Sequence, residues 1–190
     1  MILLGYVLGS IPFGYVVGRL LKVDVTKAGS GNIGATNVSR ILGFKAGLFV
    51  FLLDMLKGTL AVIFANVYLG DPSLIVIVGL SAVIGHMSSI FLNFKGGKGA
   101  AVGLGVLLGI APDICFFTII IVVLVMVVTK YVSLSSIIGA ITASLLMIIL
   151  QKPAPYLVIT VLATILIIYK HKGNISRLIS GTERKIGEKS

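Results

Sequence analysis

Long apolar stretches alternate with short polar ones along almost the whole chain. A helix needs about 20 residues to cross the ~30 Å hydrocarbon core of a bilayer, so this chain has room for about seven crossings. The apolar stretches cover residues 1–21, 46–69, 73–91, 99–111, 114–129, 132–150 and 154–169. We interpret them as seven transmembrane helices, and the pattern therefore predicts an all-α polytopic membrane protein.

The fourth and fifth stretches are short, and only Pro112 and Asp113 separate them. They form either a hairpin of two crossings or one kinked crossing. Basic residues distinguish these arrangements, because the cytoplasmic loops of membrane proteins are enriched in lysine and arginine. With seven crossings and the N-terminus outside, every basic residue lies inside except Lys57, which is within a crossing, and Lys152, which is outside.

A single crossing over residues 99–129 would instead place Lys130 and the basic tail on the side opposite the first two loops. The positive-inside rule therefore favours seven crossings, with a C-terminal tail of about residues 171–190 in the cytoplasm. The basic residues predicted to lie inside are Arg19, Lys22, Lys27, Arg40, Lys45, Lys95, Lys98, Lys130, Lys170, Lys172, Arg177, Arg184, Lys185 and Lys189.

Composition agrees with a membrane location. Hydrophobic residues make up 57% of the chain and charged residues 12%, with a mean hydropathy of +1.14. So little polar surface could not enclose these apolar residues in a soluble globule, so lipid must solvate them. No length remains for a separate soluble domain, and we interpret residues 1–190 as one integral membrane domain. The first stretch lacks the basic segment and cleavage site of a signal peptide, so we expect a retained span.

The net charge of +10 is concentrated on the cytoplasmic side in this arrangement. A positive surface there suits anionic lipid headgroups and phosphorylated metabolites, although topology control alone would also produce it. The expected partners are membrane lipids and small phosphorylated molecules, and not nucleic acid. We expect the chain to act as a monomer.

Three polar segments on the cytoplasmic side combine glycine with hydrogen-bond donors and cations. They cover residues 27–40, 94–99 and 171–177. Glycine lets the backbone turn its N–H groups toward an anion, while serine, threonine, asparagine, lysine and arginine add donors and charge. Each segment alone could be a tight interhelical turn, but three on one face predict a phosphate-binding site. The G-x-G-x-x-G order of Gly29, Gly31 and Gly34 follows no strand, so context excludes a dinucleotide fold.

Two further ionisable groups lie inside predicted spans. Asp54 and Lys57 are three residues apart and share one helical face, where charges in lipid are costly unless paired. We interpret them first as a structural pair, with a substrate role as the alternative. His86, in the third span, is expected to be an interhelical hydrogen-bond partner, whereas His171 borders the basic tail.

The polar side chains of the chain include many that can bind anions and few that can accept a proton. The carboxylates form no evident acid–base pair, no cysteine lies beside a base, and two separated histidines do not indicate a metal centre. Such a site suits a reaction whose substrate already carries a good leaving group, since positioning and electrostatic stabilisation then supply most of the rate. A transporter of anionic metabolites would need the same residues.

Four motifs decide between these alternatives: residues 9–14 (GSIPFG), 29–37 (GSGNIGATN), 94–99 (FKGGKG) and 171–183. In this order they resemble the bacterial acyl-phosphate:glycerol-3-phosphate acyltransferases, the PlsY family. The resemblance implies transfer of a fatty acyl group from acyl phosphate to the sn-1 hydroxyl of glycerol 3-phosphate, giving lysophosphatidic acid and phosphate. It also implies no metal or other cofactor, and a bacterial cytoplasmic (inner) membrane location with the active site facing the cytoplasm.

The resemblance also carries residue roles. The catalytic candidates are Ser30, Arg40, Lys98, His171 and Asn174. The substrate-binding candidates are Gly29, Gly31, Asn32, Thr36, Asn37, Lys95, Gly96, Gly97, Gly99 and Arg177, and the accessory candidates are Asp54, Lys57, His86 and Glu183. We expect direct attack without an acyl-enzyme, in which either a substrate phosphate oxygen or His171 accepts the hydroxyl proton.

The chain departs from the family pattern at Ser88, Ser89 and Val102, which weakens a catalytic role for His86. The alternative function is a membrane transporter or binding protein for anionic metabolites. Residues 114–129 and 154–169 offer it almost no polar path, and the sequence has no inverted halves of the kind many transporters show. A purely structural subunit is a third possibility, but it has little need for three phosphate-type loops.

Overall fold

The computed structural model describes residues 1–188 as a bundle of helices, and Lys189 lies outside the described residues. Apart from an isolated bridge between Ser89 and Lys95, these residues contain no β-structure, so the all-α prediction is confirmed. The elements are α1 (Ile2–Ser10), α2 (Phe13–Leu20), α3 (Ala35–Leu42), α4 (Phe44–Leu69), α5 (Pro72–Met87), η1 (Ile90–Leu92), α6 (Ala100–Ile110), α7 (Pro112–Thr129), α8 (Val132–Ile149), α9 (Ala154–Lys170) and α10 (Lys172–Ile179).

Length and composition make four segments of residues 1–188 suitable membrane spans. They are Ile2–Leu20, Phe44–Leu69, Pro112–Thr129 and Val132–Ile149. A fifth arises if α9 and α10, which meet at a bend of 60°, count as one, while α5 and α6 are shorter apolar helices. The stretches predicted at 99–111 and 114–129 are separate helices, and Pro112 begins the second.

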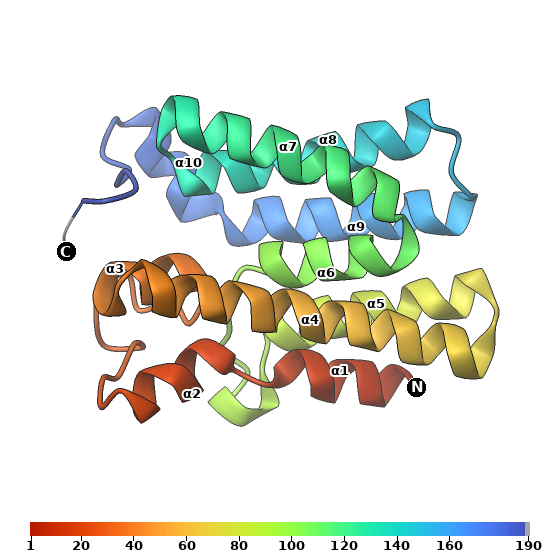
Figure 1. Cartoon of the computed structure of the whole chain (residues 1–190), viewed down its shortest axis with the longest axis horizontal. Coiled ribbons are helices and arrows are strands. Elements are labelled where there is room, and N and C mark those ends of the chain that lie inside the picture. Colours follow the sequence, from red (N-terminus) through yellow and green to blue (C-terminus); the bar gives the residue numbers. More distant parts are fainter. Residues whose placement is uncertain (189–190) are drawn as a thin grey trace.

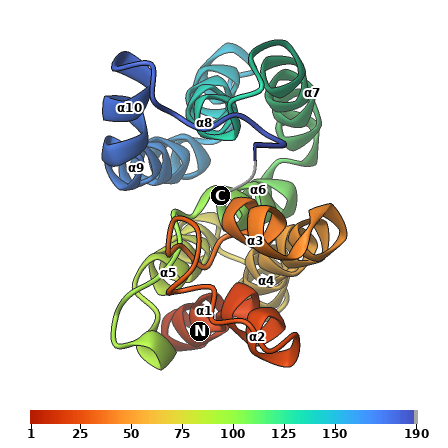
Figure 2. The same ribbon diagram turned by 90° about the vertical axis from the view of Figure 1, so that its left-hand side faces the viewer.

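The long helices run along one axis, with the N-terminus at one end of the molecule and α3 and α10 at the other (Figure 1). Seen along that axis, helices α1 to α5 form one group and α7 to α10 a second, with α6 between them (Figure 2). The three polar segments singled out in the sequence all lie at the end that carries α3 and α10 (Figure 1).

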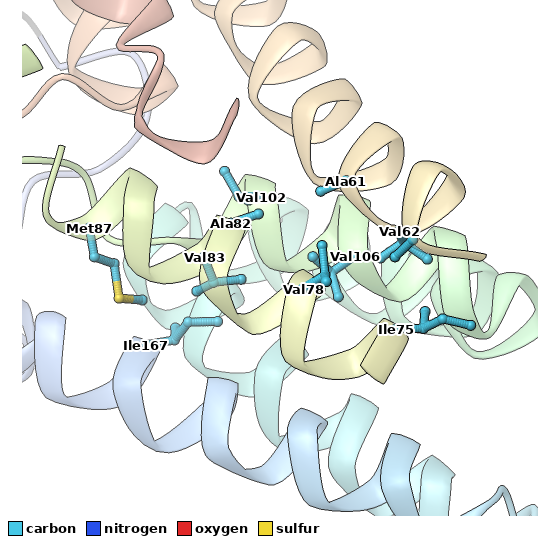
Figure 3. Packing of buried hydrophobic residues seen from close by; sticks show 11 residues of the cluster. Ala61, Val62, Ile75, Val78, Ala82, Val83, Met87, Val102, Val106 and Ile167 are labelled. Atoms are coloured by element: carbon cyan, nitrogen blue, oxygen red, sulfur yellow. The ribbon is translucent and has the colours of Figure 1, made fainter. Parts of the chain in front are cut away.

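Small apolar side chains hold the two groups together. Figure 3 shows the central cluster, in which Ala61 and Val62 of α4 lie near Val83 of α5, Val102 of α6 and Ile167 of α9. Large apolar side chains instead point outward near both ends of the bundle, since Leu3 and Val128 are each 74% exposed. A surface of large exposed apolar side chains is stable only where lipid covers it.

Glycines allow the closest helix contacts. A Cβ added to Gly9 of α1 would lie 2.0 Å from the Ala82 carbonyl oxygen on α5, and one added to Gly105 of α6 would lie 1.9 Å from the Met55 carbonyl oxygen on α4. Within lipid, where no hydrophobic force drives helices together, close backbone packing of this kind stabilises their association.

The predicted first helix, residues 1–21, is wrong as one helix because it breaks at Ile11 and Pro12. Proline has no N–H and its ring clashes with the preceding turn, so the helix cannot continue through it. The break leaves carbonyl oxygens that need donors within the protein. Ser89 Oγ donates to Ser10 O at 2.5 Å and Lys57 Nζ donates to Ile11 O at 2.7 Å, so two distant segments stabilise the break.

Candidate functional site

Asn37 organises the first polar segment from the start of α3. Its amide nitrogen donates to the carbonyl oxygens of Val25, Ala28 and Asn32, and its Oδ1 accepts from the Ser30 amide at 2.8 Å. Gly29 has φ +60°, and a Cβ there would lie 2.4 Å from Asn37 Oδ1, so only glycine fits. Asn37 is buried and fully engaged in this way, and the loop it holds turns Ser30 and Asn32 toward a cavity.

The second segment packs directly on α5. The Gly97 amide donates to His86 O at 3.0 Å, so it has no free N–H to offer a phosphate. A Cβ on Gly96 would lie 2.1 Å from the same carbonyl oxygen. Glycine is therefore required here for close packing, and the segment carries Lys98 to the cavity at its end.

Glu183 organises the third segment. It is buried and accepts hydrogen bonds from Ser133 Oγ and Asn174 Nδ2, both at 2.6 Å, and from Arg177 Nε at 2.7 Å. Because Asn174 uses its Nδ2 for Glu183, its Oδ1 is free to accept from Lys98 Nζ, which it does at 2.5 Å. The chain Glu183–Asn174–Lys98 thereby joins α10 and the tail to the segment that precedes α6.

These three segments enclose a cavity of about 420 Å³. Six cationic side chains border it, and Glu183 is its only carboxylate among the described residues. Glu183 forms an ion pair with Arg177, but one carboxylate cannot neutralise six cations, so the cavity keeps a net positive charge. The lining residues are Gly29, Ser30, Asn32, Arg40, Lys98, Lys170, Lys172, Gly173, Asn174, Arg177, Glu183 and Arg184.

Burial shifts the proton affinities of the site. Burial lowers the pKa of Lys98 to about 8, with Arg177 and Arg40 lowering it further while Glu183 opposes. Burial also lowers the pKa of Arg40. Burial would raise the pKa of Glu183, but the hydrogen bonds from Ser133, Asn174 and Arg177 hold it below its ordinary value. At neutral pH the cavity therefore contains charged Lys98 and an ionised Glu183.

His171 is neutral at the same pH. Burial lowers its pKa to about 4, and its Nδ1 donates to Ile167 O at 2.8 Å. The imidazole proton therefore sits on Nδ1, and Nε2 carries the lone pair. Lys98 contributes to the lowered pKa by repulsion, so the ring lies near the cavity although it does not border it.

The structure brings together about half of the site residues predicted from sequence. Eight of them border the cavity: Gly29, Ser30, Asn32, Arg40, Lys98, Asn174, Arg177 and Glu183. Eight others from the same segments do not: Gly31, Thr36, Asn37, Lys95, Gly96, Gly97, Gly99 and His171. Sequence reasoning missed Lys170, Lys172, Gly173 and Arg184 as site residues, although each lies next to a predicted site residue, His171, Asn174 or Glu183.

The accessory candidates Asp54, Lys57 and His86 form a separate buried cluster. Lys57 Nζ faces Asp54 Oδ1 at 2.8 Å without a well-aligned hydrogen bond, and it lies 3.0 Å from His86 Nδ1. These contacts favour the structural interpretation of the pair over direct substrate contact.

Comparison with known proteins places this geometry in a family. The family model of glycerol-3-phosphate acyltransferase matches residues 1–181, almost the whole chain. The chain belongs to the glycerol-3-phosphate acyltransferase family. Its relatives include the glycerol-3-phosphate acyltransferases of Rippkaea orientalis, 46% identical over all of this chain and 93% of that protein, and of Aquifex aeolicus, 41% identical over 97% of each chain.

Solved structures of the family agree with this fold. The chain is similar to the crystal structure of PlsY (YgiH), an integral membrane glycerol 3-phosphate acyltransferase, in its glycerol 3-phosphate form. The two share 41% identity and a TM-score of 0.93 over 98% of this chain and 94% of that one. The lysophosphatidic acid form of PlsY gives a TM-score of 0.91. The sequence-based identification of the family is therefore confirmed.

Proposed function

We propose that this acyltransferase moves a fatty acyl group from acyl phosphate to the sn-1 hydroxyl of glycerol 3-phosphate, releasing lysophosphatidic acid and inorganic phosphate. The observation that carries the proposal is a cavity to which residues 1–188 contribute six cationic side chains and one carboxylate, Glu183, which already accepts hydrogen bonds from three side chains. Both substrates of this reaction carry a phosphate, and such a cavity stabilises phosphates more than any neutral ligand. The relatives named as glycerol-3-phosphate acyltransferases support the acceptor.

The chemistry requires little beyond positioning. The sn-1 hydroxyl oxygen attacks the carbonyl carbon of the mixed anhydride, the bond from that carbon to the phosphate oxygen breaks, and phosphate leaves with the electron pair. Arg40 and Lys98 reach the cavity from one helix group, and Arg177 reaches it from the other. Their charges would hold the two phosphates and stabilise the departing one. Ser30 and Asn32 would orient the glycerol hydroxyls.

The hydroxyl proton would pass to a substrate phosphate oxygen. His171 is the rival base, but with a pKa of about 4 it is a weak proton acceptor compared with a phosphate monoester, whose second pKa is ~6. Direct attack needs no acyl-enzyme, and no step of it needs a metal ion or other cofactor.

We further propose seven crossings with the N-terminus outside, in a bacterial cytoplasmic membrane. Four segments of residues 1–188 are long and apolar enough to cross, or five if α9 and α10 count as one, and the shorter apolar helices α5 and α6 would supply the remaining two. Phe44, Phe94 and Tyr169 directly precede Lys45, Lys95 and Lys170 in the chain, and their side chains are 67%, 66% and 61% exposed. Lys170 itself borders the cavity. Aromatic rings and lysines of this kind prefer the membrane–water interface. A cavity at that level is open to glycerol 3-phosphate from water and to acyl phosphate from lipid, and the chain would work as a monomer.

Purified protein is expected to release inorganic phosphate from acyl phosphate only when glycerol 3-phosphate is present, with lysophosphatidic acid formed in equal amount. Acyl-CoA and acylated carrier protein should give no product, because their acyl groups are thioesters and carry no phosphate leaving group for the cations of the cavity to stabilise. A phosphate-release assay with mass analysis of the lipid measures both. Turnover with acyl-CoA, or phosphate release without acceptor, would contradict the proposed donor.

The pH dependence of kcat/KM separates the two candidate bases. We expect kcat/KM to rise as the pH increases through ~6, where a free phosphate monoester loses its second proton. His171→Ala should remain active and show the same rise, because the proposed base belongs to the substrate. The value of kcat/KM should fall above pH of about 8, where Lys98 loses its charge beside Arg40, Arg177 and Glu183. Full wild-type activity down to a pH of about 4, abolished by His171→Ala, would assign the base to His171.

Cysteine labelling tests the seven crossings. In a Cys115→Ser background, Lys27→Cys and Lys185→Cys should react with a membrane-impermeant maleimide only after the cells are permeabilised. Gln151→Cys, in the α8–α9 turn, should react in intact cells. With a single crossing over residues 99–129, positions 151 and 185 would exchange sides, so labelling of Lys185→Cys from outside would overturn this topology.

A further inference from the structure

Three buried ionisable side chains take no part in the proposed reaction. Asp54, Lys57 and His86 are 2%, 3% and 4% exposed, in helices α4 and α5. The Lys57 ammonium lies 2.8 Å from Asp54 Oδ1, 3.0 Å from His86 Nδ1 and 2.7 Å from Ile11 O. Two of its N–H groups thus donate to Ile11 O and His86 Nδ1, and the Asp54 carboxylate lies beside the ammonium as its counter-charge. Charged groups are costly at this depth, so such a cluster needs a reason beyond packing.

The cluster fixes the state of the His86 ring. An ammonium has donors and no lone pair, so His86 Nδ1 must accept from it and the ring proton must sit on Nε2. Lys57 therefore holds the Nδ1 side of the ring and leaves the opposite side facing away from the cluster.

That opposite side lies against the segment that carries Lys98. A Cβ on Gly97 would be 2.1 Å from His86 Nε2, so the backbone there rests on the ring. The Gly97 amide also donates to His86 O, and Gly96 packs on the same carbonyl oxygen. His86 therefore contacts Gly97, the residue before Lys98, through both its ring and its backbone.

Lys98 in turn reaches across the cavity to Asn174 Oδ1. Any displacement of the Gly97 backbone relative to α5 therefore moves the Lys98 ammonium relative to the phosphate that it is proposed to bind. We infer that the buried Asp54–Lys57–His86 cluster positions Lys98, with His86 as the positioning residue that transmits the contact. The inference rests on the proposed function of the cavity, because it assigns the cluster an effect only through Lys98.

A double-mutant cycle between His86 and Lys98 tests the inference. In His86→Asn the amide oxygen can replace Nδ1 as the acceptor for Lys57, but no ring remains against Gly97. We expect kcat/KM to fall by ~10–100-fold, mainly through a higher KM for glycerol 3-phosphate, because small displacements of a binding group cost that much. In a Lys98→Gln background the same substitution should have no further effect.

The matched control is Ser81→Ala. Ser81 is also buried in α5, but its hydroxyl lies 2.7 Å from Val78 O and 3.0 Å from Ile2 O, and neither partner belongs to the cavity or to the segment that carries Lys98. It should leave KM and kcat unchanged. His86→Gln places an amide near Nε2 instead, so it should recover affinity relative to His86→Asn and serves as the test if His86→Asn does not fold.

The outcomes are distinct. Losses that multiply in the His86→Asn/Lys98→Gln protein would show that His86 acts independently of Lys98 and would overturn the inference. Binding of glycerol 3-phosphate by calorimetry supplies the same cycle where turnover is too slow to measure. If Lys98→Gln alone binds and turns over like the wild type, the proposed function of the cavity fails instead.

Discussion

The hydrogen bond between Lys98 and Asn174 is the contact on which the site depends, because it joins the two helix groups across the cavity. Lys98 comes from the segment between α5 and α6, which packs on the first group, and Asn174 comes from α10 in the second group. Glu183 orients Asn174 for this contact and neutralises part of the charge around it. The other cations repel one another around a space of about 420 Å³, and a phosphate bound there, as proposed, would relieve this repulsion.

The membrane explains why polar contacts far from the cavity are so specific. A broken helix in lipid leaves carbonyl oxygens without water, and each must find a donor within the protein. Lys57 and Ser89 supply donors to Ile11 and Ser10, and Lys57 also binds the side chains that support the segment before Lys98. The kink at Pro12 and the position of the site are therefore linked through one ammonium group.

Much of the fold could be predicted from sequence, because lipid requires long apolar helices and the charge pattern constrains their connections. The break at Pro12 was hidden within a continuous apolar run, and the short helices α3 and α10 were missed because glycine and polar residues interrupt their patterns. In the site, sequence identified the segments and eight of the residues that border the cavity, but it could not separate these from the residues that hold the segments in place. Asn32 and Asn37 have the same chemistry, and only the fold determines that the first borders the cavity and the second holds the loop. Lys170 was interpreted only as a topology signal, and Lys172 only as part of a phosphate-type segment and not as a site residue. Nothing local distinguishes a cation that would bind substrate from one that binds lipid headgroups.

The central claim is that cations from both helix groups bind one phosphate-bearing substrate together. The most direct measurement is the change in unfolding temperature of the detergent-solubilised protein on addition of glycerol 3-phosphate, with glycerol as the uncharged control. Ligand at ~100 times its Kd should stabilise the wild type by ~2.7 kcal/mol. Lys27→Gln, which removes an exposed charge outside the cavity, should be stabilised equally, and Arg40→Gln should lose most of the effect. Equal stabilisation of Arg40→Gln, or stabilisation of the wild type by glycerol alone, would contradict the account.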